Sequence, residues 1–275
     1  MSVTWAQYRR ARRRSRQAWI VLAAAALTLV LTLVWFFADG QFRLGGGFSD
    51  GPTDAPVLAA WMSPIAAVRA VPAGRAADLL ESLPVRASDP AANYDRAAFG
   101  QAWLDVDRNG CDTRNDILRR DLVDARFTDG SRCRIGSGSF REPYTGRQTA
   151  FRRGADSSKA IQIDHVVALG DAWQTGAQQL TALQRTHLAN DPLNLVAADG
   201  PANQDKSSSD AAGWLPPNKA FRCHYVARQV SVKAAYALWV TAAEKDAMRR
   251  VLGSCPDQAT IRPNQQWGQP TIRPG

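Results

Sequence analysis

The chain has 275 residues, 45% of them hydrophobic and 21% charged, and a formal net charge of +9. This composition excludes a collagen-like or wholly disordered chain and leaves room for one sizeable domain with additional segments. Six of the nine net positive charges come from arginines in the first 17 residues, which leaves three for the rest of the chain. The charge is therefore weak evidence for a polyanionic partner, and a function must be argued from a site.

The first 38 residues have the pattern of a membrane-insertion segment. Residues 1–17 contain no acidic residue, and residues 18–38 are 21 uncharged residues rich in Leu, Val and Ala with an aromatic end. This length predicts a transmembrane helix, and the positive-inside rule places the basic segment in the cytoplasm. A cleaved signal peptide is the alternative, although the apolar run is longer than is usual for one. In both cases the rest of the chain is predicted to be extracellular.

The remaining chain divides by composition into three parts. Residues 39–90 are predicted to be a linker, because glycines and prolines interrupt its first half. Within it, residues 73–83 have apolar residues at intervals of three and four, which predicts one short helix. Residues 91–256 are predicted to form one domain, and the proline-containing residues 257–275 a disordered tail.

The predicted domain mixes helices and strands, which indicates an α+β fold. Helical spacing of apolar residues occurs at 96–104, 112–121, 221–239 and 243–252. Runs typical of strands occur at 133–137, 147–153 and 161–169. The helix at 112–121 has Asp112 or Thr113 as its N-cap.

All four cysteines lie in the predicted extracellular part, at Cys111, Cys133, Cys223 and Cys255. Their spacing contains no C-x-x-C pair, which argues against a zinc site, and an oxidising exterior favours two disulfides. Three pairings are possible. The local pairs Cys111–Cys133 and Cys223–Cys255 are favoured, and each would contribute about 3–4 kcal/mol in the chain-entropy model.

The most specific chemical signal is Asp164 followed directly by His165 in the apolar run at 161–169. Adjacent residues on a strand point to opposite faces, so the carboxylate can hold a cation while the imidazole activates water at the same phosphate. Asn194 opens a second strand-like run, and Asn203 follows nine residues later at a predicted helix start. A lone histidine is more often a core residue, but this combination favours a metal-dependent nuclease.

These residues resemble the exported, GmrSD-like family of HNH endonucleases, which have a ββα-metal site. The matching motifs lie at 109–114, 143–146, 164–169, 190–195, 203–206 and 214–217. The resemblance implies that His165 is the general base, that Asn194 orients it, and that Asp164 and Asn203 bind the cation. It does not cover the first 90 residues. The span between His165 and Asn194 is longer than in compact HNH proteins and is predicted to hold inserted helices.

Carboxylate and amide oxygens are hard ligands, which favours Mg²⁺ or Mn²⁺ at Asp164 and Asn203. Lys206 lies three residues after Asn203, on the same helix face, and is a candidate for binding a phosphate. Arg114 is the second candidate for substrate binding because it belongs to one of the matching motifs. The alternative for both is an ordinary surface charge.

The sequence therefore predicts an α+β fold with a ββα-metal core and surrounding helices, preceded by one transmembrane helix. The expected function is that of an exported, membrane-anchored HNH endonuclease that cleaves DNA, more than RNA, with little sequence preference, because no recognition module is visible. No protein partner is implied. The alternative is a catalytically inactive, metal-stabilised binding module at the cell surface. A serine hydrolase is disfavoured because residues 91–256, the predicted domain, contain no G-x-S-x-G motif.

Overall fold

The computed structural model of the chain describes residues 69–89, 93–154 and 159–267. All of them belong to the second of two units, Leu58–Gly275. The predicted cytoplasmic segment, the predicted transmembrane helix and most of the predicted linker lie outside the described residues. Within the described ranges, no helix combines the length and the apolar character needed to cross a bilayer.

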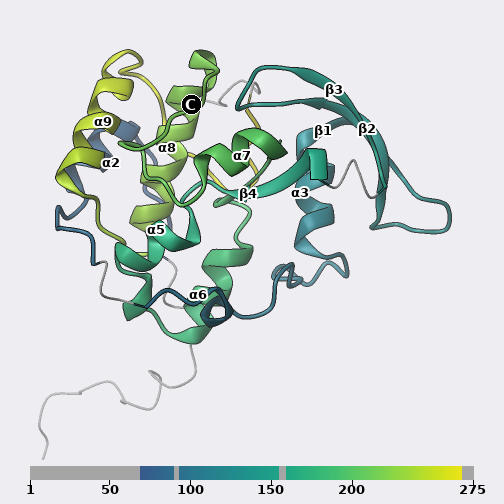
Figure 1. Cartoon of the computed structure of the whole chain (residues 1–275), viewed down its shortest axis with the longest axis horizontal. Coiled ribbons are helices and arrows are strands. Elements are labelled where there is room, and N and C mark those ends of the chain that lie inside the picture. The colour runs from purple at the N-terminus through teal and green to yellow at the C-terminus, as the bar shows by residue number, and fades with distance from the viewer. Residues whose placement is uncertain (1–68, 90–92, 155–158, 268–275) are drawn as a thin grey trace, which may run out of the picture. The chain divides into compact units, whose positions relative to one another are not determined.

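Helices and short 3₁₀ turns outnumber the strands, most of which lie toward the right in Figure 1, so the described domain is α+β as predicted. The helical elements are α2 (Ala76–Ser82), η2 (Arg96–Phe99), α3 (Thr113–Asp121), α5 (Leu169–Gln174), η3 (Ala177–Gln179), α6 (Ala182–Asn190), α7 (Gly200–Lys206), α8 (Lys219–Ala235) and α9 (Ala242–Gly253). Two of them, α5 and α6, are the inserted helices that the sequence predicts between His165 and Asn194. The predicted helix at 96–104 is limited to the single turn η2, because Gly100 follows with φ of 75°.

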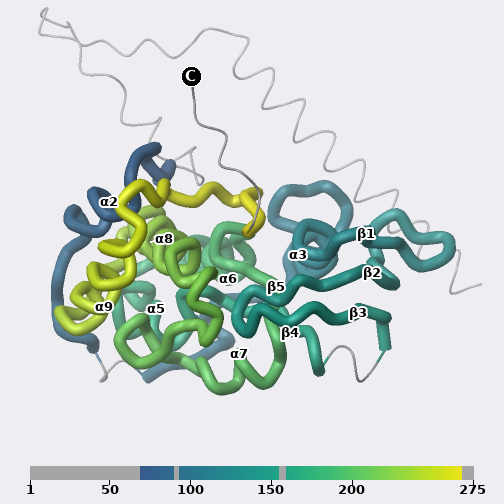
Figure 2. Tube along the Cα trace, turned by 90° about the horizontal axis from the view of Figure 1, so that it is seen from above, coloured from purple at the N-terminus to yellow at the C-terminus, as the bar shows by residue number. Residues whose placement is uncertain are grey.

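The strands form two separate antiparallel sheets. The larger sheet has the order β1 (Leu122–Phe127), β2 (Ile135–Arg141) and β3 (Gln148–Arg152), which run side by side in Figure 2. The smaller sheet pairs β4 (Ile161–His165) with β5 (Leu195–Asp199). The first strand, β1, was not predicted because it follows α3 without an intervening turn signal. The predicted strand at 161–169 ends at His165, and α5 begins at Leu169.

The smaller sheet leads directly into α7, so strand, strand and helix follow one another as predicted. The carboxylate of Asp199 accepts a hydrogen bond from the Ala202 amide at 3.0 Å and caps α7, and Pro201 occupies its first turn. Side-chain caps also begin α3, where Asp112 accepts from the Asn115 amide at 2.8 Å. Local sequence therefore explains where these helices start.

The two faces of the β4–β5 sheet pack against different apolar clusters. Val196 and Ala198 belong to the larger cluster, which includes much of α8, whereas Ile163 and Leu195 belong to a smaller one with α3 and β2. Because successive strand residues alternate between faces, both faces of β4 are covered by protein. The sheet is consequently a stiff support for the residues at the end of β4.

Two disulfides link segments of the domain that lie 22 and 32 residues apart in the sequence. Cys111 pairs with Cys133 and Cys223 with Cys255, with Cα–Cα distances of 5.2 and 6.4 Å, which are the two favoured pairings. The predicted disordered tail needs correction over residues 257–267. Ile261 is fully buried in the larger cluster and Ala259 forms a bridge with Arg75, so this segment packs on the domain.

Candidate functional site

Asp164 and His165 stand at the end of β4 and point to opposite faces of the sheet. Asp164 pairs across the sheet with Val196, and His165 pairs with Leu195, so the two side chains lie against different surroundings. Both residues are buried, with 6% and 8% of their surface exposed. The carboxylate and the imidazole are therefore surrounded by different residues, one on each face of β4.

The His165 ring is held by a backbone carbonyl. Its Nε2 lies 2.8 Å from the carbonyl oxygen of Ala189, at the end of α6. A carbonyl oxygen can only accept, so Nε2 carries the hydrogen and Nδ1 keeps the lone pair in the neutral ring. Burial lowers the pKa of His165 to about 4, although the Ala189 carbonyl and Asp164 oppose this shift. The imidazole is neutral at neutral pH, which is the state that a general base requires.

Asn194 joins the two segments that hold His165. Its side-chain oxygen accepts a hydrogen bond from the Val167 amide at 2.8 Å, and its amide group donates to the carbonyl oxygens of Val167 and Leu188 at 3.2 and 3.4 Å. Val167 lies two residues after His165, and Leu188 immediately precedes Ala189. Asn194 is fully buried, so this arrangement fixes both the backbone of the imidazole and the carbonyl that it contacts.

On the other face of β4, Asp164 is enclosed by two side chains. The Tyr144 hydroxyl donates to one carboxylate oxygen at 2.5 Å, and the Lys206 ammonium lies 3.1–3.2 Å from both carboxylate oxygens. Lys206 also donates to the His165 carbonyl at 2.8 Å and has no exposed surface. Burial and the neighbouring Asp164 raise the pKa of Tyr144 above its usual range, so its hydroxyl keeps its proton.

Asn203 faces the same side of β4 as Asp164. Its side-chain amide donates to the Gln162 side-chain oxygen at 2.8 Å, and Gln162 lies two residues before Asp164 on the strand. The structure thus brings Asp164, Asn203 and Lys206 to one interface between β4 and α7. It places His165 on the opposite side of the strand.

The two candidates for substrate binding are both engaged with protein. Lys206 is enclosed behind Asp164 and cannot reach a phosphate in this arrangement. Arg114, on α3, donates to the Ile161 carbonyl at 3.4 Å and lies over the Trp103 ring, 5.8 Å from its centre. The sequence prediction assumed a solvent-facing lysine, because helical spacing alone does not tell which side of a short helix is covered.

Two further residues contribute to the site without having been assigned a role from sequence. Tyr144 belongs to one of the motifs that carry the resemblance. It lies 20 residues before Asp164 in the sequence, so no local pattern predicts the contact between them. Arg96, in η2, lines a small cavity together with His165, and its positive charge contributes to lowering the pKa of His165. No local pattern marks Arg96, because it is brought to the site by tertiary contacts.

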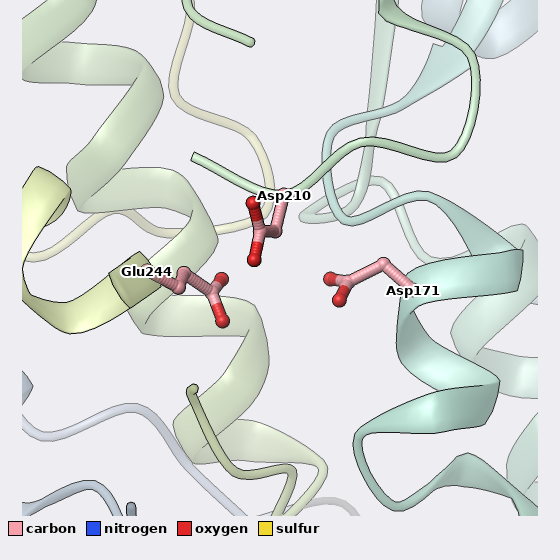
Figure 3. Close-up of side chains that lie close together, drawn as sticks. All are labelled: Asp171, Asp210 and Glu244. Atoms are coloured by element: carbon pink, nitrogen blue, oxygen red, sulfur yellow. The ribbon is translucent and has the colours of Figure 1, made fainter. Parts of the chain in front are cut away.

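A second acidic group lies apart from Asp164 and could hold a metal. Carboxylate oxygens of Asp171 on α5, Asp210 after α7 and Glu244 on α9 lie within 4.8 Å of one another and point toward a common centre (Figure 3). The ammonium of Lys233 lies 3.1 Å from Asp171 and 2.9 Å from Glu244. Burial raises the pKa of Asp171 and raises that of Glu244 to about 7, although the Lys233 ammonium opposes both shifts.

Comparison with known proteins identifies a matching family and a similar protein. The family described as GmrSD restriction endonucleases, C-terminal domain, matches residues 112–251, which is just over half of the chain and includes β4, β5 and α7. An uncharacterized secreted protein of Arthroderma benhamiae is 37% identical over 185 residues, which cover 66% of this chain and 86% of that protein. No solved structure matches the chain.

Proposed function

Because the chain belongs to the family of GmrSD restriction endonuclease C-terminal domains, we propose that its exported domain is a nuclease of the HNH type. Its substrate would be nucleic acid, DNA in preference to RNA, cleaved with little sequence preference. The observation that carries the proposal is the state of His165: a neutral imidazole whose Nε2 is committed to the Ala189 carbonyl and whose Nδ1 keeps its lone pair. Strand, strand and helix around this residue support the HNH assignment.

In this mechanism the Nδ1 atom of His165 takes a proton from the attacking water as the water oxygen bonds to phosphorus. The hydrogen bond from Nε2 to the Ala189 carbonyl strengthens as the ring becomes positive, because charged donors form stronger hydrogen bonds. Asn194 is the positioning residue. It holds Val167 and Leu188 in place, so the ring cannot turn away during the reaction.

A divalent cation, Mg²⁺ or Mn²⁺, remains our proposal for Asp164 and Asn203. The donor set fits, because a carboxylate and an amide oxygen are hard ligands on one face of β4. Such an ion would supply positive charge on the face of β4 opposite to the His165 side chain. The ammonium of Lys206 now neutralises the Asp164 carboxylate, so an ion binds there in competition with that ammonium.

Lys206 is therefore proposed to act first as the counterion of Asp164. Its ammonium group can bind a phosphate only after the ion pair with Asp164 has broken. Arg114 keeps a proposed role in gripping the substrate backbone with the part of its side chain that Trp103 leaves free. Neither residue contributes sequence recognition, since contacts to phosphates carry no base information.

We also propose that residues 18–38 anchor the protein in the membrane with the nuclease domain outside the cell, or that the domain is secreted if this segment is cleaved. The relative from Arthroderma benhamiae is described as a secreted protein, which supports export. Both disulfides agree with an oxidising environment, where such bonds persist.

The proposal is tested by plasmid cleavage with a fragment covering residues 69–267, with Mg²⁺, with Mn²⁺ and with a chelator. We expect His165→Ala to lower the cleavage rate by about 10²–10⁴, the usual contribution of a general base. His187→Ala is the matched control, because it removes a half-buried histidine of α6 that forms none of the hydrogen bonds around His165. Full activity of His165→Ala, with an unchanged circular dichroism spectrum, would contradict the mechanism. DNA or metal binding by the wild type without any cleavage would favour the inactive binding module.

A further inference from the structure

The imidazole of His165 opens onto a small cavity of about 50 Å³. Besides His165, its walls include Arg96, Gln101, Trp103, Leu169 and Ala189. One molecule of liquid water occupies about 30 Å³, so the cavity has room for one or two water molecules. A nucleophilic water beside the imidazole therefore has a place to lie. The phosphorus that it attacks must lie at the mouth of the same cavity.

Arg96 provides the positive charge at this mouth. Its side chain is exposed, and none of the hydrogen bonds or ion pairs formed by the described residues engages its guanidinium. The neighbouring carboxylate of Asp95 accepts from the Ala97 amide at 2.9 Å, as the cap of η2. A guanidinium held beside a general base and free of a carboxylate is available for an anion from outside.

The other basic residues near β4 do not reach this position. Lys206 is enclosed on the opposite face of the strand against Asp164. Arg114 lies over Trp103 and donates to the Ile161 carbonyl. Arg96 is thus the basic side chain that lines the cavity with His165. The open face of the site combines a base and a cation from two segments that are 69 positions apart in the sequence.

We propose that Arg96 binds the non-bridging oxygens of the scissile phosphate at the mouth of the His165 cavity; this inference rests on the proposed nuclease function. As the water oxygen bonds to phosphorus, its proton passes to Nδ1 of His165. The bond from phosphorus to the leaving ester oxygen breaks with its electron pair, and that oxygen takes a proton from solvent. Negative charge increases on the non-bridging oxygens in the transition state, between attack and departure of the leaving oxygen. The guanidinium can donate two parallel N–H hydrogen bonds, which match the geometry of these oxygens.

The test compares three full-length variants in plasmid cleavage: Arg96→Gln, Arg96→Lys and the control Arg250→Gln, which removes an exposed arginine from α9. We expect Arg96→Gln to lower kcat about 10²–10³-fold, the usual effect of removing one donor to a developing oxyanion. Arg96→Lys should keep part of the activity, because it keeps the charge and loses the fork. Arg250→Gln should cleave like the wild type.

A binding measurement separates a phosphate contact from a structural role. In the His165→Ala background, DNA affinity is measured against salt concentration. Adding Arg96→Gln should reduce the slope of log K against log salt by about one, whereas adding Arg250→Gln should leave it unchanged. A loss of cleavage smaller than tenfold relative to Arg250→Gln, or an unchanged slope, overturns the assignment of Arg96. Absence of cleavage by the wild type refutes the proposed function and this inference together. Cleavage by Arg96→Gln at the rate of Arg250→Gln, together with loss of cleavage in His165→Ala, refutes only the inference.

Discussion

The ion pair between Lys206 and Asp164 gives the sharpest test of the arrangement behind β4. Lys206→Met keeps the length and apolar stem of the side chain and removes its charge. Asp164 is 6% exposed, and in this variant its carboxylate keeps one side-chain hydrogen-bond donor, the Tyr144 hydroxyl. Breaking a buried ion pair on one side costs about 3–5 kcal/mol. For a domain of this size that corresponds to a fall in Tm of roughly 6–20 °C.

A double-mutant cycle isolates the pair itself. Asp164→Asn removes the negative charge with little change of volume, and the free energy of unfolding is measured in urea for both single variants and for Asp164→Asn/Lys206→Met, with the disulfides intact. We expect the double variant to be more stable than the sum of the single effects predicts by about 2 kcal/mol or more, because no uncompensated charge remains in it. Additivity within about 0.5 kcal/mol would refute the structural argument, since it would mean that the two groups do not interact.

The same variant tests the competition with a cation. In Lys206→Met the carboxylate of Asp164 has lost its ammonium, so an added divalent ion no longer has to displace it. We expect Mg²⁺ to raise the Tm of Lys206→Met and to leave that of Asp164→Asn/Lys206→Met unchanged, by linkage between binding and folding. An equal effect of Mg²⁺ on both variants would place the ion elsewhere.

Three further predictions concern stability. Burial raises the pKa of Glu244 from 4.5 to about 7, so between these pH values the folded protein keeps a proton that the unfolded chain releases. The free energy of unfolding should therefore fall by up to roughly 3 kcal/mol as the pH rises from 4.5 to 7. In urea titrations, Glu244→Gln should flatten that part of the pH profile. Gly200→Ala should destabilise by about 1–3 kcal/mol, because its Cβ would overlap the Lys159 backbone carbonyl, whereas Gly253→Ala, with nothing within 4 Å, should be neutral or slightly stabilising in thermal unfolding. Replacing the Cys223–Cys255 pair by serines should cost about 3–4 kcal/mol in the same assay, and an unchanged Tm would show that this loop is constrained by other contacts.

The sequence predicted the elements of the site better than their contacts. The order of strand, strand and helix followed from local signals: an apolar run before His165, a second run after Asn194 and a proline in the first turn of α7. Both disulfides followed from loop length and location. These features depend on neighbouring residues, so a single sequence carries them.

Contacts between distant segments could not be predicted in the same way. The carbonyl that holds His165 belongs to Ala189, the hydroxyl on Asp164 belongs to Tyr144, and Arg96 comes from a turn before the matched family region. Lys206 was expected to face a phosphate because it lies three residues after Asn203 on the same helix face, and it is buried because a carboxylate faces it. Strand alternation predicted that Asp164 and His165 would separate, but only tertiary packing decides which face stays open.

Two lysines without exposed surface, Lys206 and Lys233, affect how the described domain can fold. Lys206 and Lys233 each supply an internal positive charge to a carboxylate group that would otherwise demand an ion for its neutrality. Small metal-dependent domains commonly stay unfolded until their ion arrives. The described domain therefore supplies the positive charge at both carboxylate groups itself, so its folding does not depend on an added cation at either place.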